Sequence, residues 1–125
     1  MANRPTILIC DDEPNLRELM RMSLEPSYEF AEAADGAEAI DLAERVRPDL
    51  VLLDVMMPGT SGLEVIEHLR SRPDLAATPI VVVSAFAAAS DRRAAYAAGA
   101  TEFLKKPFEP EALSTLVESL LATNA

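Results

Sequence analysis

The stretch that decides the fold is Thr6-Ile-Leu-Ile-Cys10-Asp11-Asp12, a continuous apolar run that ends in two carboxylates. Three later runs have the same form and end in Asp54 (residues 50–53), Ser84 (residues 80–83) and Lys106 (residues 103–105). Short Val, Ile and Leu runs separated by helical stretches are typical of parallel strands that are buried on both faces. Because the carboxyl ends of such strands share one edge of an open sheet, the residues that follow them are predicted to meet there.

Between these runs the sequence has helical patterns, and no linker or repeat interrupts the alternation. This order predicts an α/β domain, in which helices cover both faces of a parallel sheet. Helices are predicted after Pro14 and after Pro110, and the capping-box spacings of Asp35 with Glu38 and of Ser61 with Glu64 predict two more. Apolar residues at helical spacing, which include Leu19 and Val46, are expected to face the core.

Two segments have weaker patterns. Residues Tyr28 to Ala33 are predicted to form a strand at the edge of the sheet. A fourth helix is predicted over about Ser90 to Ala98, with Gly99 at its end. Since its apolar positions are mostly alanine, it buries little area, and we expect it to be the most loosely held helix.

The composition indicates a single domain over residues 1–125, because 50% of the 125 residues are hydrophobic and can form one core. Every apolar run is shorter than the roughly 20 residues of a membrane span. The formal net charge of -10 disfavours binding to nucleic acid or to an anionic membrane. The first residues are too few and too polar for a secretory signal, and Cys10 is expected to be a reduced core thiol, so a cytoplasmic location is favoured.

The predicted cluster has the chemistry of a phosphoryl site. Asp11, Asp12 and Asp54 offer only oxygen ligands, which suit Mg²⁺. Lys106 would add a positive charge, and Ser84 would donate a hydrogen bond to a phosphate oxygen. A carboxylate that attacks phosphorus fits this set, because no Ser/His/Asp or Cys/His pair and no glycine-rich phosphate loop accompanies it.

Each of these residues also has a simpler interpretation. Any one of the acids or Ser84 could cap a helix or sit in a loop, and Lys106 alone could be a solvated surface residue. It is their joint position at one sheet edge that favours a site. His68, the only histidine, falls on a polar helix face and is expected to be solvated. Met56 and Met57 are interpreted as packing residues.

Several segments in their order closely resemble the response-regulator receiver domain of two-component signalling, and the resemblance covers essentially the whole chain. The segments are Ile9–Glu13, Leu52–Gly59, Ser84-Ala85, Asp91 and Ala98–Phe108. The resemblance implies a flavodoxin-like fold, with five helices around five parallel strands in the order 2-1-3-4-5.

The resemblance also implies the roles of the site residues. Asp54 would accept a phosphoryl group from the phosphohistidine of a histidine kinase or a phosphotransfer protein. Mg²⁺ would be held by Asp11, Asp12, Asp54 and the backbone carbonyl of Met56. Lys106 is the family's lysine because it directly precedes Pro107, and this Lys-Pro bond is expected to be cis. The domain would catalyse only its own phosphotransfer and dephosphorylation.

The implied switch uses Ser84 and Phe103. Phosphorylation adds roughly two negative charges, Ser84 moves toward them, and Phe103 fills the space that Ser84 leaves. The face made by the predicted helix over about Ser90 to Ala98, the run at residues 103–105 and the helix after Pro110 would then change for an output domain, a partner protein or a phosphorylation-dependent homodimer. Because the last helix carries few charges, no specific dimer mode is indicated. The bulky Met56 and Phe86 would flank the phosphoryl group and slow its hydrolysis.

Three other functions stay open at this point. A haloacid-dehalogenase-type phosphohydrolase also uses an aspartyl phosphate and Mg²⁺, but it has an acid two residues after the nucleophile, where this chain has Met56. A flavodoxin-like electron carrier would need a Ser/Thr/Gly-rich loop after the first strand, where this chain has Asp11-Asp12-Glu13. A receiver that docks partners without being phosphorylated would not need the complete set of acids.

Overall fold

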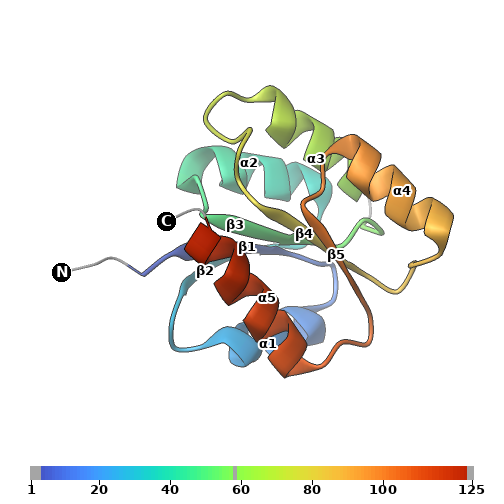
Figure 1. Ribbon diagram of the computed structural model, residues 1–125. Helices are drawn as coiled ribbons and strands as arrows, with labels where there is room; N and C mark the ends of the chain where they lie inside the picture. Colours follow the sequence, from blue (N-terminus) through green and yellow to red (C-terminus); the bar gives the residue numbers. More distant parts are fainter. Residues whose placement is uncertain (1–3, 58, 124–125) are drawn as a thin grey trace.

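The computed structural model describes residues 4–57 and 59–123, in which five strands alternate with five helices (Figure 1). The elements are β1 Thr6–Cys10, α1 Pro14–Leu24, β2 Glu29–Ala33, α2 Gly36–Val46, β3 Leu50–Leu53, α3 Gly62–Ser71, β4 Ile80–Ser84, α4 Ala89–Ala98, β5 Glu102–Lys105 and α5 Pro110–Thr123. Pro58, which belongs to the Leu52–Gly59 segment of the family resemblance, lies outside the described residues.

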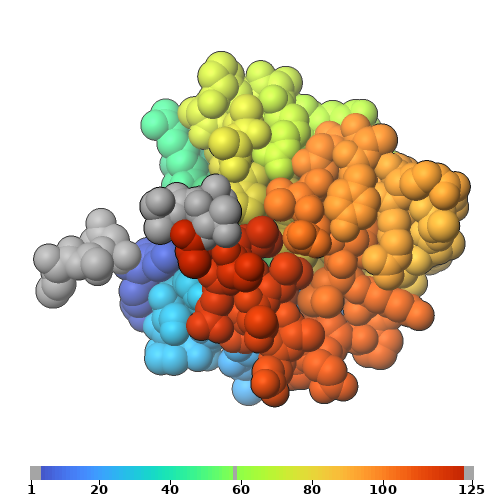
Figure 2. All heavy atoms as spheres, in the orientation of Figure 1, coloured from blue at the N-terminus to red at the C-terminus, as the bar shows by residue number. Residues whose placement is uncertain are grey.

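The strands form one parallel sheet in the order β2-β1-β3-β4-β5, which confirms the predicted topology. In Figure 1, α1 and α5 cover one face of the sheet, and α2, α3 and α4 cover the other. Figure 2 shows that side chains of α5 occupy the middle of the near surface, beside those of α4 and β5. The strand from Glu29 to Ala33 lies at the edge of the sheet, as predicted.

The core consists of two clusters, one on each face of the sheet. Alternate strand residues point to opposite faces, so neighbouring residues of one strand belong to different clusters. Leu8 and Val82 pack toward α2, α3 and α4, whereas Ile9 and Val81 pack toward α1 and α5. Burial on both faces explains why these strands are continuous apolar runs.

The two predicted capping boxes differ in the structure. At α3, the Ser61 hydroxyl accepts from the Glu64 N–H, and the Glu64 carboxylate accepts from the Ser61 N–H, both at 3.3 Å. At α2, Asp35 accepts from the Glu38 N–H at 2.8 Å, but the Glu38 carboxylate accepts from the Ala34 N–H instead of from Asp35. The predicted capping box is therefore complete at α3, whereas at α2 only the hydrogen bond to Asp35 is present.

Two residues that were expected in the core are exposed. Leu19 is 39% exposed on α1, and Val46 is 38% exposed. Val46 is the last residue of α2, and Arg47 follows in a left-handed conformation with φ of 51°. The chain thus leaves the helical conformation directly after Val46, whose side chain stays partly exposed.

The small burial of α4 is confirmed, since Ala95 is its only buried residue. The helix starts at Ala89, one residue before the prediction, and ends at Ala98; Gly99 caps it, and its φ of 121° suits a residue without a Cβ. The free cysteine Cys10 is fully buried, as expected. Among the described residues, no helix combines the length and the hydropathy that crossing a membrane requires.

Candidate functional site

The predicted site residues meet at the carboxyl edge of the sheet. Backbone hydrogen bonds continue the strand pairing one residue past the strand ends. The Asp54 N–H donates to the Cys10 carbonyl at 2.9 Å, and the Lys106 N–H donates to the Ser84 carbonyl at 2.9 Å. These bonds fix the backbone at Asp54 and at Lys106, from which the two side chains extend.

Lys106 connects two of the acids across a long sequence separation. Its Nζ donates to Asp11 Oδ2 at 2.6 Å and to Asp54 Oδ2 at 2.9 Å. Asp11 is fully buried and Asp54 is 7% exposed, so both carboxylates need such a partner. Burial lowers the pKa of Lys106, but the hydrogen bonds and charges of Asp11 and Asp54 outweigh it and raise the pKa above its ordinary value. The ammonium group is therefore charged at neutral pH.

The three acids form a set that could hold a metal ion. One carboxylate oxygen from each of Asp11, Asp12 and Asp54 lies within 4.8 Å of the others. Mg²⁺ prefers oxygen ligands and usually keeps several of its waters. The three carboxylates offer such ligands, and the exposed position of Asp12 leaves room for water.

The residues after Asp54 correct one expectation. The Met56 N–H donates to Asp54 Oδ1 at 3.0 Å, which points the backbone of Met56 at the acid. Its side chain is 55% exposed and does not pack in the core, so that interpretation was wrong for Met56. It was right for Met57, which is 7% exposed and belongs to the core.

Ser84 and Phe103 are both buried. The Ser84 hydroxyl accepts from the Phe86 N–H at 3.2 Å. The Phe103 ring is 8% exposed and lies under the guanidinium group of Arg92, whose carbon is 4.7 Å from the ring centroid. Ser84 thus contacts the segment that leads into α4, and Phe103 packs against α4 itself.

Two side-chain interactions were not predicted from the sequence. Arg17 donates to the Asp11 carbonyl at 2.6 Å, although nothing in the sequence spacing indicates it. His68, which was expected to be solvated, lies on the surface but is paired with Glu44 at 2.7 Å. The pairing depends on how α2 and α3 pack together, which helix periodicity alone does not give.

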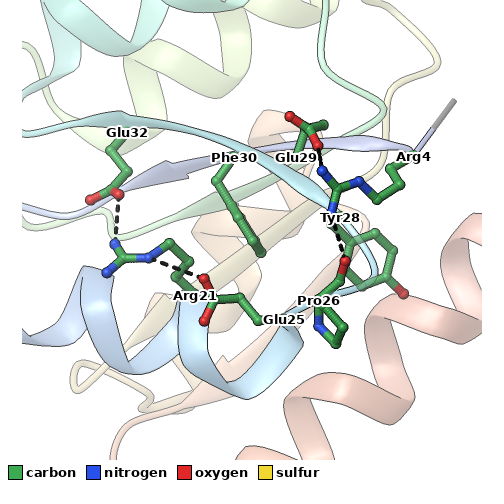
Figure 3. A pocket seen from close by; sticks show the side chains of 8 residues that line it. All are labelled: Arg4, Arg21, Glu25, Pro26, Tyr28, Glu29, Phe30 and Glu32. Atoms are coloured by element: carbon green, nitrogen blue, oxygen red, sulfur yellow. Dashed lines mark hydrogen bonds and ion pairs between the residues drawn. The ribbon is translucent and has the colours of Figure 1, made fainter.

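The hollow in Figure 3 lies away from the acid cluster, between the end of α1 and the edge strand β2. Its volume is about 480 Å³. Both arginines that line it are occupied, since Arg4 pairs with Glu29 and Arg21 pairs with Glu25 and Glu32. Because three glutamates and two paired arginines line it, this hollow does not favour an anionic ligand.

Comparison with known proteins decides the family. The family model for the response regulator receiver domain matches residues 7–118. The chain belongs to this family. It is a receiver domain of a two-component response regulator, and the sequence resemblance is confirmed.

Relatives agree with this assignment. The receiver domain is 40% identical over 121 residues to the transcriptional regulatory protein ResD of Bacillus subtilis (strain 168), covering 96% of this chain and 49% of that protein. It is 46% identical over 116 residues to the response regulator MprA of Mycobacterium sp. (strain KMS), covering 92% and 50%. The chain thus spans about half the length of the curated relatives it matches.

Solved structures agree on the fold. The chemotaxis response regulator CheY4 of Vibrio cholerae superposes with a TM-score of 0.88 at 31% identity, covering 94% of this chain and 99% of that chain. The REC domain of AraT, a response regulator from Geobacillus stearothermophilus, superposes with a TM-score of 0.86 at 31% identity, covering 97% and 95%.

Proposed function

We propose that Asp54 of this receiver domain accepts a phosphoryl group from the phosphohistidine of a histidine kinase or a phosphotransfer protein. The observation that carries the proposal is the bridge from Lys106 Nζ to Asp11 and Asp54, at 2.6 and 2.9 Å, beside a third acid. This arrangement supports the proposal, because a carboxylate, an ammonium group and two further acids that could hold a metal ion lie close together.

In the proposed reaction, a carboxylate oxygen of Asp54 attacks phosphorus while the P–N bond of phosphohistidine breaks. The imidazole nitrogen keeps the electron pair of that bond, and Asp54 becomes an acyl phosphate. The Lys106 ammonium neutralises charge on the transferred oxygens, and the Met56 N–H orients the acid. Mg²⁺ held by Asp11, Asp12, Asp54 and the Met56 carbonyl would supply further charge neutralisation when bound.

The output of the switch is proposed to be the face of α4, β5 and α5. The Ser84 hydroxyl, which now accepts from Phe86, can donate to a phosphoryl oxygen. Phe103 is proposed to fill the space that Ser84 leaves, and the segment between Ser84 and α4 would shift with it, because Ser84 contacts Phe86 in that segment and Phe103 contacts Arg92 on α4. The α4 helix, buried only at Ala95, has little packing to oppose a shift.

We propose that the receiver acts in the cytoplasm as one domain over residues 1–125. Its partners are proposed to be a phosphodonor protein and an output domain or protein, with a phosphorylation-dependent homodimer as one form of output. The net charge of -10 disfavours direct binding to nucleic acid or to an anionic membrane.

The test is incubation with Mg²⁺ and a small-molecule phosphodonor, read by intact mass. Wild type is expected to gain one PO₃ unit, and Asp54→Asn is expected to gain none. Equal gain by both proteins would contradict the proposal. Repeated turnover of phosphate esters would instead favour a phosphohydrolase, although Met56 stands where such an enzyme needs its acid.

A further inference from the structure

Arg17 contacts the backbone of Asp11, one of the three acids of the site. The residue lies on the first turns of α1, and its side chain is only 17% exposed. Nη1 donates to the backbone carbonyl of Asp11 at 2.6 Å, and Nε donates to Glu32 at 3.0 Å. One guanidinium group thus connects the end of β1 to the edge strand β2.

The other polar groups of Asp11 have separate partners. Its N–H donates to the Ala33 carbonyl at 3.0 Å, Oδ1 accepts from the Glu13 N–H at 3.0 Å, and Oδ2 accepts from Lys106 at 2.6 Å. The carbonyl oxygen is the group that Arg17 holds. This oxygen belongs to the peptide plane that joins Asp11 to Asp12, so fixing it also fixes where Asp12 begins.

Asp12 depends on that plane more than the other acids do. Asp11 and Asp54 are anchored through their carboxylates by Lys106. The Asp12 carboxylate is exposed, and it has no hydrogen bond or ion pair within residues 4–57 and 59–123. Its place near the other two acids therefore follows from the backbone.

We propose that Arg17 is a positioning residue, which holds the Asp11–Asp12 peptide so that both acids can bind Mg²⁺ together. The proposal rests on the proposed function, because it assumes that these acids are the magnesium ligands. Residues that orient metal ligands without touching the metal typically contribute 10–100-fold to affinity, so loss of Arg17 is expected to weaken Mg²⁺ binding by roughly 10-fold.

The direction of the effect distinguishes positioning from charge. A cation near a divalent metal repels it, so removing the charge of Arg17 alone would strengthen Mg²⁺ binding. Weaker binding requires that the guanidinium group acts through the peptide it holds.

Arg21 provides a matched control. It lies one turn further along α1 and donates to the same Glu32 at 2.8 Å (Figure 3). Its ion-pair partners within the described residues are Glu18, Glu25 and Glu32, and none of them belongs to the acid cluster. Loss of Arg21 therefore removes a similar ion pair without touching the Asp11–Asp12 peptide.

The experiment is calorimetric titration of the whole chain with MgCl₂, using wild type, Arg17→Met and Arg21→Met, together with urea unfolding of each. The expected result is a dissociation constant that rises roughly 10-fold in Arg17→Met and less than about 2-fold in Arg21→Met. Arg17→Lys keeps the charge but cannot present the two-pronged guanidinium group, so it is expected to show the same weakening and serves if Arg17→Met does not fold.

Two results would overturn the inference while the proposed function stands: unchanged or tighter binding in the Arg17 variants, or equal weakening in the Arg17 and Arg21 variants. Failure of wild type itself to bind Mg²⁺ would instead overturn the magnesium site, and the inference with it.

Discussion

Polar replacements of Met56 and Phe86 are expected to shorten the lifetime of phosphorylated Asp54. The backbones of both residues contact the site, because the Met56 N–H donates to Asp54 at 3.0 Å and the Phe86 N–H donates to Ser84 at 3.2 Å. Their side chains, 55% and 53% exposed, line one largely apolar hollow of about 200 Å³ together with Val55, the residue that follows Asp54. Water that approaches the phosphorus from this side meets two apolar groups.

The magnitude follows from what a polar group would offer that water. Asparagine at position 56 and serine at position 86 could each add one hydrogen bond, worth about 1 kcal/mol. Together they would lower the barrier by about 2 kcal/mol, which corresponds to roughly 30-fold faster hydrolysis. Folding should change little, since both side chains are half exposed in the wild type.

The assay starts from protein phosphorylated with a small-molecule donor, which is then removed, and follows the loss of PO₃ by intact mass. Met22→Asn is the matched control, because Met22 is 62% exposed on α1 and does not line the hollow. The control should decay like wild type. An unchanged or longer lifetime in the Met56→Asn, Phe86→Ser double variant would refute the reasoning.

Three further predictions concern stability and titration. Arg70→Met should lose about 2–4 kcal/mol in urea unfolding followed by circular dichroism, because its guanidinium group donates to the Gly99 and Thr78 carbonyls at 2.9 and 2.7 Å; an unchanged midpoint would contradict this. Gly62→Ala should lose about 3 kcal/mol in the same assay, since a Cβ there would overlap the backbone of the β3–α3 loop, and full stability would show that the loop can move aside. The pKa of Tyr28 is raised from 10.0, first by burial and then by the charge of Glu118. The neutral form of Tyr28 therefore stabilises the folded state. This contribution is fully present below pH 10 and is lost as the pH rises through the higher pKa of the folded state. Because the chain has two tyrosines and no tryptophan, Tyr28→Phe should remove the higher-pH part of the tyrosinate absorbance, and a titration curve that only halves in height would count against the shift.

The sheet and the meeting of the acids could be predicted because both follow from local pattern. Strands buried on both faces must be apolar throughout, as Leu50–Leu53 is, and parallel strands bring their ends to one edge. The edge strand was harder to predict, because charged residues such as Glu32, which pairs with Arg17, interrupt its apolar pattern.

Contacts made by long side chains across elements could not be predicted. Arg17 reaches back to Asp11, and Arg92 lies over Phe103, only because the helices dock at particular angles on the sheet. The same applies to His68 and Glu44, which come together where α2 and α3 pack. Helix periodicity identifies the outward face of such residues but not the partner they find there.

Chemical mapping of the phosphoryl group tests the central claim most directly. Borohydride reduces an acyl phosphate to an alcohol, so a phosphorylated aspartate becomes homoserine, which peptide mass mapping can locate. The protein is treated with a small-molecule phosphodonor in Mg²⁺ or in excess chelator and is then reduced. The account predicts homoserine at position 54 in the Mg²⁺ sample alone, and homoserine at another acid, or equally in both samples, would contradict it.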